Sequence, residues 1–367
     1  MRRWKASLVL LLVFLFGPAL TKGDSPDPAS ELRRLSEAIK AAKTQVRFEA
    51  ELTAIAFSGD ETSVSRFRVK YAYPYRKRES LEEQGKARFV VLEDGKYLWS
   101  YFPERKIVVK EPLRKLDSPF PLCPTEDLDL LMKNYRLVIR GPVPTGGIQC
   151  RIVEFIPRSE DRPRREFWLE ERWNVPVRIR LSSHDGRPAY MLELSKIHWD
   201  PELDEEAFGL KVPQDTKVYE VWEKENLTEE ETERLIQSPL VLPRRIPDGY
   251  RRHNIVLRME GPRRCLQVIY TDGLSSFSVF QEWPGSGETA QQAEMQHPLQ
   301  AAAAAPLARQ YGLMNVVTLP GTGRKAVIVG DIQQDRLIEM AESFRDSLRE
   351  SLRESLGETF QQNPNLP

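Results

Sequence analysis

The segment Val46-Arg47-Phe48-Glu49-Ala50-Glu51-Leu52 alternates apolar and charged residues along its length. Such alternation is typical of a β-strand that buries one face and exposes the other. The same pattern returns in Arg66–Tyr71, in the runs 87–91 and 175–181, and again at 190–194. Asp94-Gly95, which lies between two apolar runs, is a strong hairpin signal. The series predicts one large, twisted, antiparallel sheet built from consecutive hairpins.

Two helices are expected beside this sheet. Leu32, Leu35, Ile39 and Ala42 recur at helical spacing after Asp27, which is a candidate N-cap. A second, short helix is expected over 126–133, capped by Thr125. The expected class is therefore α+β, with roughly eight or nine strands in the first domain, a sheet long enough that it must curl or close.

A curled sheet with an apolar concave face and only two short helices to fill it predicts a ligand cavity. The alternative is that aromatic side chains simply fill the space as core. A register error of one residue would move a strand's candidates to the other face. The residues expected to face the cavity are apolar members of the alternating runs: Phe48, Leu52, Phe67, Val69, Tyr71, Phe89, Val91, Trp99 and Tyr101.

The two ends of the chain differ from its middle. Residues 1–23 combine a basic start, a short apolar run and small residues, which is typical of a secretory signal peptide. The run is too short for the ~20 residues of a spanning helix, so the mature protein is expected to be exported and soluble. At the other end, residues 346–367 repeat Ser-Leu-Arg-Glu, which leaves a partner-binding helix or a frayed helical extension as alternatives.

Composition shifts divide the rest into further parts. The first domain is expected over 24–212, and residues 213–241 are interpreted as a linker with one short helix. A smaller α+β domain is expected over 242–345, ending in a helix that starts near Gln333. Within it, residues 284–312 are interpreted as a low-complexity insertion.

The three cysteines suggest at most one disulfide. Cys123 and Cys150 could close a loop in an oxidising compartment, whereas Cys265 sits in an alternating apolar run and is expected to be a buried free thiol. Their spacing predicts no metal site.

The sequence offers no catalytic constellation. Lys plus Arg and Asp plus Glu both number 54, which gives no electrostatic case for nucleic-acid binding. The four histidines are not paired at metal-ligand spacing, and no nucleophile elbow is present. Pro320–Lys325 lacks the spacing of a phosphate-binding loop and is interpreted as a turn. We therefore expect a binding protein without a cofactor, and not an enzyme.

Residues 46–212 resemble the lipoprotein-carrier fold of LolA-type proteins. The resemblance is carried by Tyr73-Pro74-Tyr75-Arg76, by Asp94-Gly95-Lys96 with Trp99 and Tyr101, by Cys150–Val153, by Phe167-Trp168-Leu169, and by the closing stretch 197–208. It implies a half-open antiparallel β-barrel with helices filling the cavity.

Residues 242–345 resemble the C-terminal domain of the MucB/RseB family of sigma-factor regulators. Leu242-Pro243, Pro247-Asp248-Gly249-Tyr250, Tyr270-Thr271-Asp272-Gly273-Leu274 and Val329-Gly330-Asp331 carry this similarity. The resemblance implies binding to the periplasmic region of a membrane anti-sigma factor, and relief of that binding by lipid or lipoprotein signals. A lipid or lipoprotein carrier of the LolA type is the alternative, although a simple carrier needs neither the second domain nor the linker.

Overall fold

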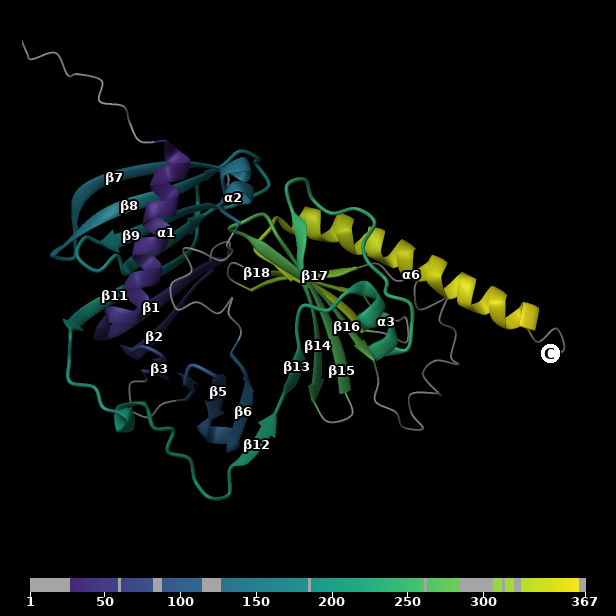
Figure 1. Ribbon diagram of the computed structural model, residues 1–367, viewed down its shortest axis with the longest axis horizontal. Helices are drawn as coiled ribbons and strands as arrows, with labels where there is room; N and C mark the ends of the chain where they lie inside the picture. Colours follow the sequence, from purple (N-terminus) through teal and green to yellow (C-terminus); the bar gives the residue numbers. More distant parts are fainter. Residues whose placement is uncertain are drawn as a thin grey trace, which may run out of the picture.

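The computed structural model describes residues 27–58, 61–81, 88–113, 127–183, 186–260, 263–283, 306–311, 314–319 and 325–362. The expected signal peptide, Thr125 and Cys123 lie outside these residues. Figure 1 shows two lobes, each built on its own sheet. We refer to residues 27–220 as the first lobe and to residues 222–362 as the second lobe. Large sheets with few helices confirm the expected α+β class.

The first lobe holds a 12-stranded sheet in the order β12-β6-β5-β4-β3-β2-β1-β11-β10-β9-β8-β7. Neighbouring strands are antiparallel, except that β12 runs parallel to β6. Over the described residues this order does not return to its first strand, so the sheet keeps two open edges. Its elements are α1 (Pro28–Gln45), β1 (Arg47–Ser58), β2 (Glu61–Ala72), β3 (Tyr75–Ser80), β4 (Val90–Glu93), β5 (Tyr97–Phe102), the 3-10 turn Pro103–Arg105, β6 (Ile107–Pro112), α2 (Leu128–Asn134), β7 (Tyr135–Thr145), β8 (Ile148–Pro157), β9 (Arg164–Glu170), β10 (Pro176–Ser182), β11 (Pro188–Trp199), the 3-10 turn Glu205–Phe208 and β12 (Lys217–Glu220).

Helix α1 covers one face of this sheet (Figure 1). Its residues Leu32, Leu35 and Ile39 are almost fully buried in one cluster with Phe48 and Tyr71. Burying an apolar side chain of this size stabilises the fold by roughly 1.5–3 kcal/mol. The expected apolar stripe of α1 therefore fills the face of the sheet, as the sequence predicted.

The caps of the helices differ from the sequence expectation. The side chain of Asp27 makes no capping hydrogen bond in α1. In α2, the carboxylate of Asp127 accepts the N–H of Leu130 at 2.9 Å and so satisfies an otherwise unpaired donor of the first turn. Asp127 is therefore the cap of α2, in the place that the sequence analysis gave to Thr125.

The segment 213–241, which was expected to be a linker, contributes to both lobes. Residues of β12 pair with β6, and after Val221 the strand β13 (Trp222–Lys224) pairs with β14 in the other sheet. Helix α3 (Glu229–Ile236) then begins with a capping box between Thr228 and Glu231. Its residue Ile236 is buried in the core of the second lobe. The chain therefore passes from the first sheet to the second at Val221, because the residues before it pair with β6 and the residues after it pair with β14.

The second lobe holds a seven-stranded antiparallel sheet in the order β13-β14-β15-β16-β19-β18-β17. Leu337, Met340, Ala341 and Phe344 of its long helix are buried against the sheet, as the spacing predicted. No helix of the described residues is both long and apolar enough to cross a membrane. The remaining elements are β14 (Arg251–Glu260), β15 (Arg263–Thr271), β16 (Ser276–Trp283), β17 (Leu307–Tyr311), β18 (Met314–Leu319), β19 (Lys325–Gly330) and α6 (Gln334–Gln362).

Two boundaries of the second lobe differ from the expected ones. Residues Leu307–Tyr311, assigned to the low-complexity insertion, form the edge strand β17 and pair with β18. The helix continues past residue 345, and Leu348 is buried in the core of the lobe. The first leucine of the Ser-Leu-Arg-Glu repeat is therefore a core residue, because the buried stripe of α6 extends one turn further than the sequence analysis assumed.

Candidate functional site

Strand register separates the candidate cavity residues into two faces. Phe48 lies opposite Tyr71 and Leu52 opposite Phe67, and both pairs lie on the face that α1 covers. Val69 lies opposite Arg78, which in turn lies opposite Val91. Phe89, two residues before Val91, packs on Phe102 with ring centroids 4.9 Å apart. Seven of the nine candidate residues therefore share one face, as expected: Phe48, Leu52, Phe67, Val69, Tyr71, Phe89 and Val91.

Trp99 and Tyr101 lie on the opposite face, which corrects their placement in the sequence analysis. Tyr101 pairs with Val90 and Trp99 with Leu92, whereas Val91 pairs with Ser100. There they pack in two small clusters together with Leu210 and neighbouring apolar residues. The reason is the hairpin after β4, which aligns Glu93 with Leu98 and so turns Trp99 and Tyr101 to the face away from α1.

A small cavity opens on the α1 side between β1–β3 and β10–β11. Its volume is about 100 Å³, and four of the predicted residues line it: Phe48, Leu52, Val69 and Tyr71. Pockets for drug-sized ligands usually measure roughly 300–1,000 Å³. Of the other predicted residues of this face, Phe67 packs against the core cluster, Phe89 packs on Phe102 and Val91 is buried. Most of the apolar face is thus occupied by protein side chains, and an acyl chain would fit only if some of them moved.

Arginine side chains stand at the rim of this cavity. Arg76 and Arg78 line it and both face Glu93, whose side chain is only 5% exposed. Glu193, which also lines the cavity, pairs with Arg178 at 2.6 Å. An apolar interior with paired guanidinium groups at its mouth can accept an apolar chain that carries a polar or anionic end.

A hairpin of the second lobe enters the first lobe. The turn between β15 and β16 carries Leu274, which is 2% exposed and belongs to the same core cluster as Leu131 and Tyr135. Gly273 has a φ of +104°, and a Cβ there would lie 2.7 Å from the backbone of Leu131. Only glycine permits both this backbone conformation and this close approach. The hairpin is therefore seated in the first lobe.

Buried polar groups surround this hairpin. The Tyr135 hydroxyl donates to the Asp272 carboxylate at 2.8 Å, and Arg162 Nε lies 3.2 Å from the same carboxylate. The Asn134 amide donates to the backbone oxygens of Asp272 at 2.8 Å and Gly249 at 2.9 Å. We refer to residues 271–276 with Asn134, Tyr135 and Arg162 as the interlobe lock. Burial, together with the negative charge of Asp272, raises the pKa of Tyr135 well above its ordinary value.

Two further ion pairs reinforce the contact between the lobes. Arg165 of the first lobe pairs with Asp331 of the second and also donates to Ser275 Oγ at 3.2 Å. At the far end of the interface, Arg258 pairs with Glu111 of β6 at 2.5 Å and with Glu223 of β13 at 3.0 Å. Sequence reasoning interpreted Asp272-Gly273 only as a turn; the apolar Leu274 directly after it was the available signal that this turn is buried.

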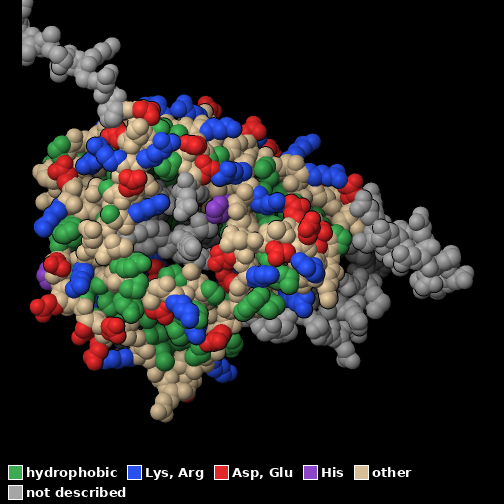
Figure 2. Space-filling view, in the orientation of Figure 1, with side chains coloured by type: hydrophobic (Ala, Val, Ile, Leu, Met, Phe, Trp, Pro, Cys, Tyr) green, Lys and Arg blue, Asp and Glu red, His purple; other side chains and the backbone are tan. Residues whose placement is uncertain are grey.

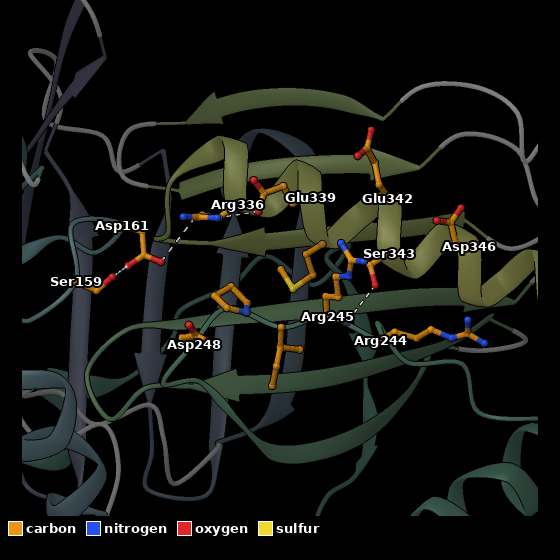
Figure 3. Close-up of a pocket in the computed structure, with 13 residues that line it drawn as sticks. Ser159, Asp161, Arg244, Arg245, Asp248, Arg336, Glu339, Glu342, Ser343 and Asp346 are labelled. Atoms are coloured by element: carbon orange, nitrogen blue, oxygen red, sulfur yellow. Dashed lines mark hydrogen bonds and ion pairs between the residues drawn. The ribbon is translucent and has the colours of Figure 1, made fainter.

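A wide polar cleft lies beside the lock (Figure 3). It has a volume of about 780 Å³, and residues from both lobes line it. Ser159 and Asp161 come from the first lobe, whereas the segment 244–248 and one face of α6 come from the second. This cleft is large enough for a peptide, and a ligand bound along it would touch both lobes.

The described residues hold no group of three or more His, Cys, Asp or Glu side chains that could bind a metal ion.

Cys150 is buried, and burial raises the pKa of its thiol. Because Cys123 lies outside the described residues, the Cys123–Cys150 pairing stays a prediction. Cys265 is half-buried, where a buried thiol was expected. Figure 2 shows acidic and basic side chains interspersed over the surface in view.

Comparison with known proteins identifies families and structures that are similar to this chain. The family model of the MucB/RseB N-terminal domain matches residues 32–211. A comparison with curated protein sequences gave no match. A crystal structure of MucB in complex with MucA(peri) is 17% identical with a TM-score of 0.55, covering 85% of this chain and 97% of that chain.

Two further structures are similar. The Pseudomonas aeruginosa MucA/MucB complex is 16% identical with a TM-score of 0.56, covering 85% of this chain and 97% of that one. MucB alone is 14% identical with a TM-score of 0.52, covering 87% and 97%. These likenesses extend the shared fold across both lobes. The match of the first lobe to the family model shows that the chain belongs to the MucB/RseB family.

Proposed function

We propose that this chain is a periplasmic, non-enzymatic regulator that binds the periplasmic region of a membrane anti-sigma factor. Membership of the MucB/RseB family supports the proposal, as do the similar structures in which MucB is bound to MucA. The two lobes then act as two domains of one binding unit. A lipid or lipoprotein acyl chain in the first lobe is the proposed signal that weakens binding.

The observation that carries the proposed sensing is the position of Leu274. This residue belongs to the second lobe, yet it lies in the same apolar cluster as Phe48 and Tyr71, which line the cavity. The cavity is too small for an acyl chain as it stands, so a bound chain must displace part of that cluster. Displacing Leu274 would release the interlobe lock, because Asp272 and Ser275 lie on the same turn. Ligand binding and lobe arrangement are thereby coupled.

The proposal is tested by affinity capture from an envelope extract of the source organism, with the mature chain as bait. We expect recovery of a single-span anti-sigma factor, identified by mass spectrometry, and loss of that partner when lysophosphatidylglycerol is added. A matched bait carrying Leu274→Ala is expected to lose less partner on lipid addition, because its lock is already loosened. Recovery of no such factor with the unaltered bait contradicts the proposal.

The second candidate is a periplasmic lipid or lipoprotein carrier of the LolA type. The apolar cavity with paired arginines at its rim favours it. The same capture separates the two functions, since a carrier is expected to recover acylated lipoproteins without an anti-sigma factor. The seated hairpin favours the regulator, because a carrier gains nothing from locking a second lobe onto its ligand-binding core.

A further inference from the structure

The cleft in Figure 3 is a groove with one long wall on each side. One wall is the face of α6 that carries Arg336, Glu339 and Glu342, and the other is the segment 244–248. The backbone N–H of Arg245 donates to Ser343 Oγ at 3.0 Å, which holds the second wall against the helix. Asp161 of the first lobe lies at one end. The groove is therefore formed before any ligand arrives and spans the boundary between the lobes.

The floor of the groove is apolar in part. Among the lining residues, Ile246 is 37% exposed and Met340 is buried. An exposed isoleucine beside polar walls offers a contact for one or two apolar side chains of a ligand. The volume of about 780 Å³ fits several residues of an extended polypeptide better than it fits a small ion or a single side chain.

The charge of the groove is negative. Its lining holds five carboxylates, Asp161, Asp248, Glu339, Glu342 and Asp346, against the three guanidinium groups of Arg244, Arg245 and Arg336. Arg336 is held by Glu339 at 2.9 Å and lies 4.0 Å from Asp161, and Arg244 pairs with Glu350. Asp248 and Glu342 have no ion pair among the described residues. The two walls thus each present an acidic group to a ligand.

We infer that this groove binds an extended, basic segment of the partner polypeptide. Lysine or arginine side chains of the segment pair with Asp248 and Glu342, and an apolar side chain between them rests on Ile246. The Arg245 guanidinium supplies N–H donors for the backbone carbonyls of the segment. This inference rests on the proposed function, since the segment belongs to the anti-sigma factor. Because the groove includes Asp161, its occupant contacts both lobes.

The test uses two fluorescein-labelled peptides, Leu-Arg-Val-Lys-Leu-Arg and Leu-Glu-Val-Glu-Leu-Glu, titrated with the full mature chain and read by anisotropy. We expect the basic peptide to bind and the acidic one not to bind. The double variant Asp248→Asn/Glu342→Gln is expected to weaken basic-peptide binding by about threefold to tenfold, since exposed pairs contribute modestly. Glu230→Gln, an exposed acid on α3 outside the groove, is the matched control and leaves binding unchanged.

The outcomes separate this inference from the function on which it rests. Equal binding of the basic peptide to the double variant and to the control overturns the groove assignment, as does tight binding of the acidic peptide. If the envelope capture recovers an anti-sigma factor equally well with the double variant, the groove assignment fails while the regulator stands. If no bait recovers such a factor, the regulator fails, whatever the peptides do.

Discussion

The Tyr135 hydroxyl in the first lobe lies 2.8 Å from the Asp272 carboxylate in the second, and both side chains are fully buried. The ring of Tyr135 meanwhile packs edge-on against Phe155 inside the core of the first lobe, with centroids 6.5 Å apart. One residue thus joins the apolar core of one lobe to the polar groups of the other. Separating the two lobes at this point would break this hydrogen bond.

Removing the Tyr135 hydroxyl tests the lock directly. Tyr135→Phe leaves a buried carboxylate with one donor fewer, so we expect the free energy of unfolding to fall by about 1–3 kcal/mol. Tyr250→Phe is the matched control, because the buried Tyr250 hydroxyl has no hydrogen-bond partner among the described residues. That change is expected to leave stability unchanged or slightly raised. Urea denaturation of both variants decides the matter, and equal losses would contradict the assigned role of Tyr135.

Truncating Leu274 tests the seating of the hairpin. Leu274→Ala removes a side chain that is 2% exposed, and such a change in a core costs about 2–5 kcal/mol. Because the residue belongs to the second lobe, we also expect faster hydrogen exchange in α2, which the hairpin contacts. The exposed Leu307, at 60%, supplies the control. If Leu307→Ala and Leu274→Ala destabilise equally, the hairpin is not seated as described.

The pH dependence of stability is expected to include Asp331. Burial raises the pKa of its carboxyl above 3.8, although the charge of Arg165 opposes the shift. The folded protein therefore holds this proton at a pH where the unfolded chain has released it. The stability gained is complete below about pH 3.8 and is lost as pH rises through the folded pKa.

The variant Asp331→Asn cannot titrate at this position. Relative to wild type, it is expected to gain stability as pH rises from about 4 to about 7, as seen in urea midpoints at several pH values. The variant also loses the ion pair with Arg165, which changes its stability at every pH. The diagnostic quantity is therefore how the stability difference between variant and wild type changes with pH. A difference that stays constant over this range would exclude Asp331 as a titrating group of the fold.

The two described cysteines are expected to differ in reactivity. Cys150 is fully buried with a raised pKa, whereas Cys265 is half-buried. Since the thiolate is the reactive form, iodoacetamide should modify Cys265 under native conditions and Cys150 only after unfolding. Peptide mapping by mass spectrometry measures both rates. If denatured Cys150 is alkylated only after reduction, the expected bridge to Cys123 is present.

Alternation along single strands was enough to predict much of the first lobe. Phe48, Val69 and Tyr71 occupy the expected face because each strand alternates without interruption and pairs with its neighbour in register. Trp99 and Tyr101 were misplaced because their face depends on how residues pair across the hairpin at Asp94. That pairing is a property of two strands together, which the pattern of either strand alone does not contain.

The contact between the lobes was beyond sequence reasoning for a different reason. Asp272-Gly273 is typical of an exposed turn, and its burial follows only from the position of α2, almost 140 residues earlier in the chain. Likewise, Lys217–Glu220 carries too short a pattern to identify a strand until β6 lies beside it. Local patterns thus predicted the elements, whereas the long-range contacts that build the lock and the cleft required the structure.

The segment from Lys217 to Lys224 also determines where this protein can be divided. Because β12 completes the first sheet and β13 starts the second, a fragment ending at residue 212 would leave the outer edge of β6 uncovered. Exposed strand edges invite aggregation. A fragment for separate study, or a module exchanged between relatives, should therefore carry β12 with the first sheet. The same logic predicts that insertions are tolerated before Pro213 more readily than at Val221, where the chain is shared by both halves.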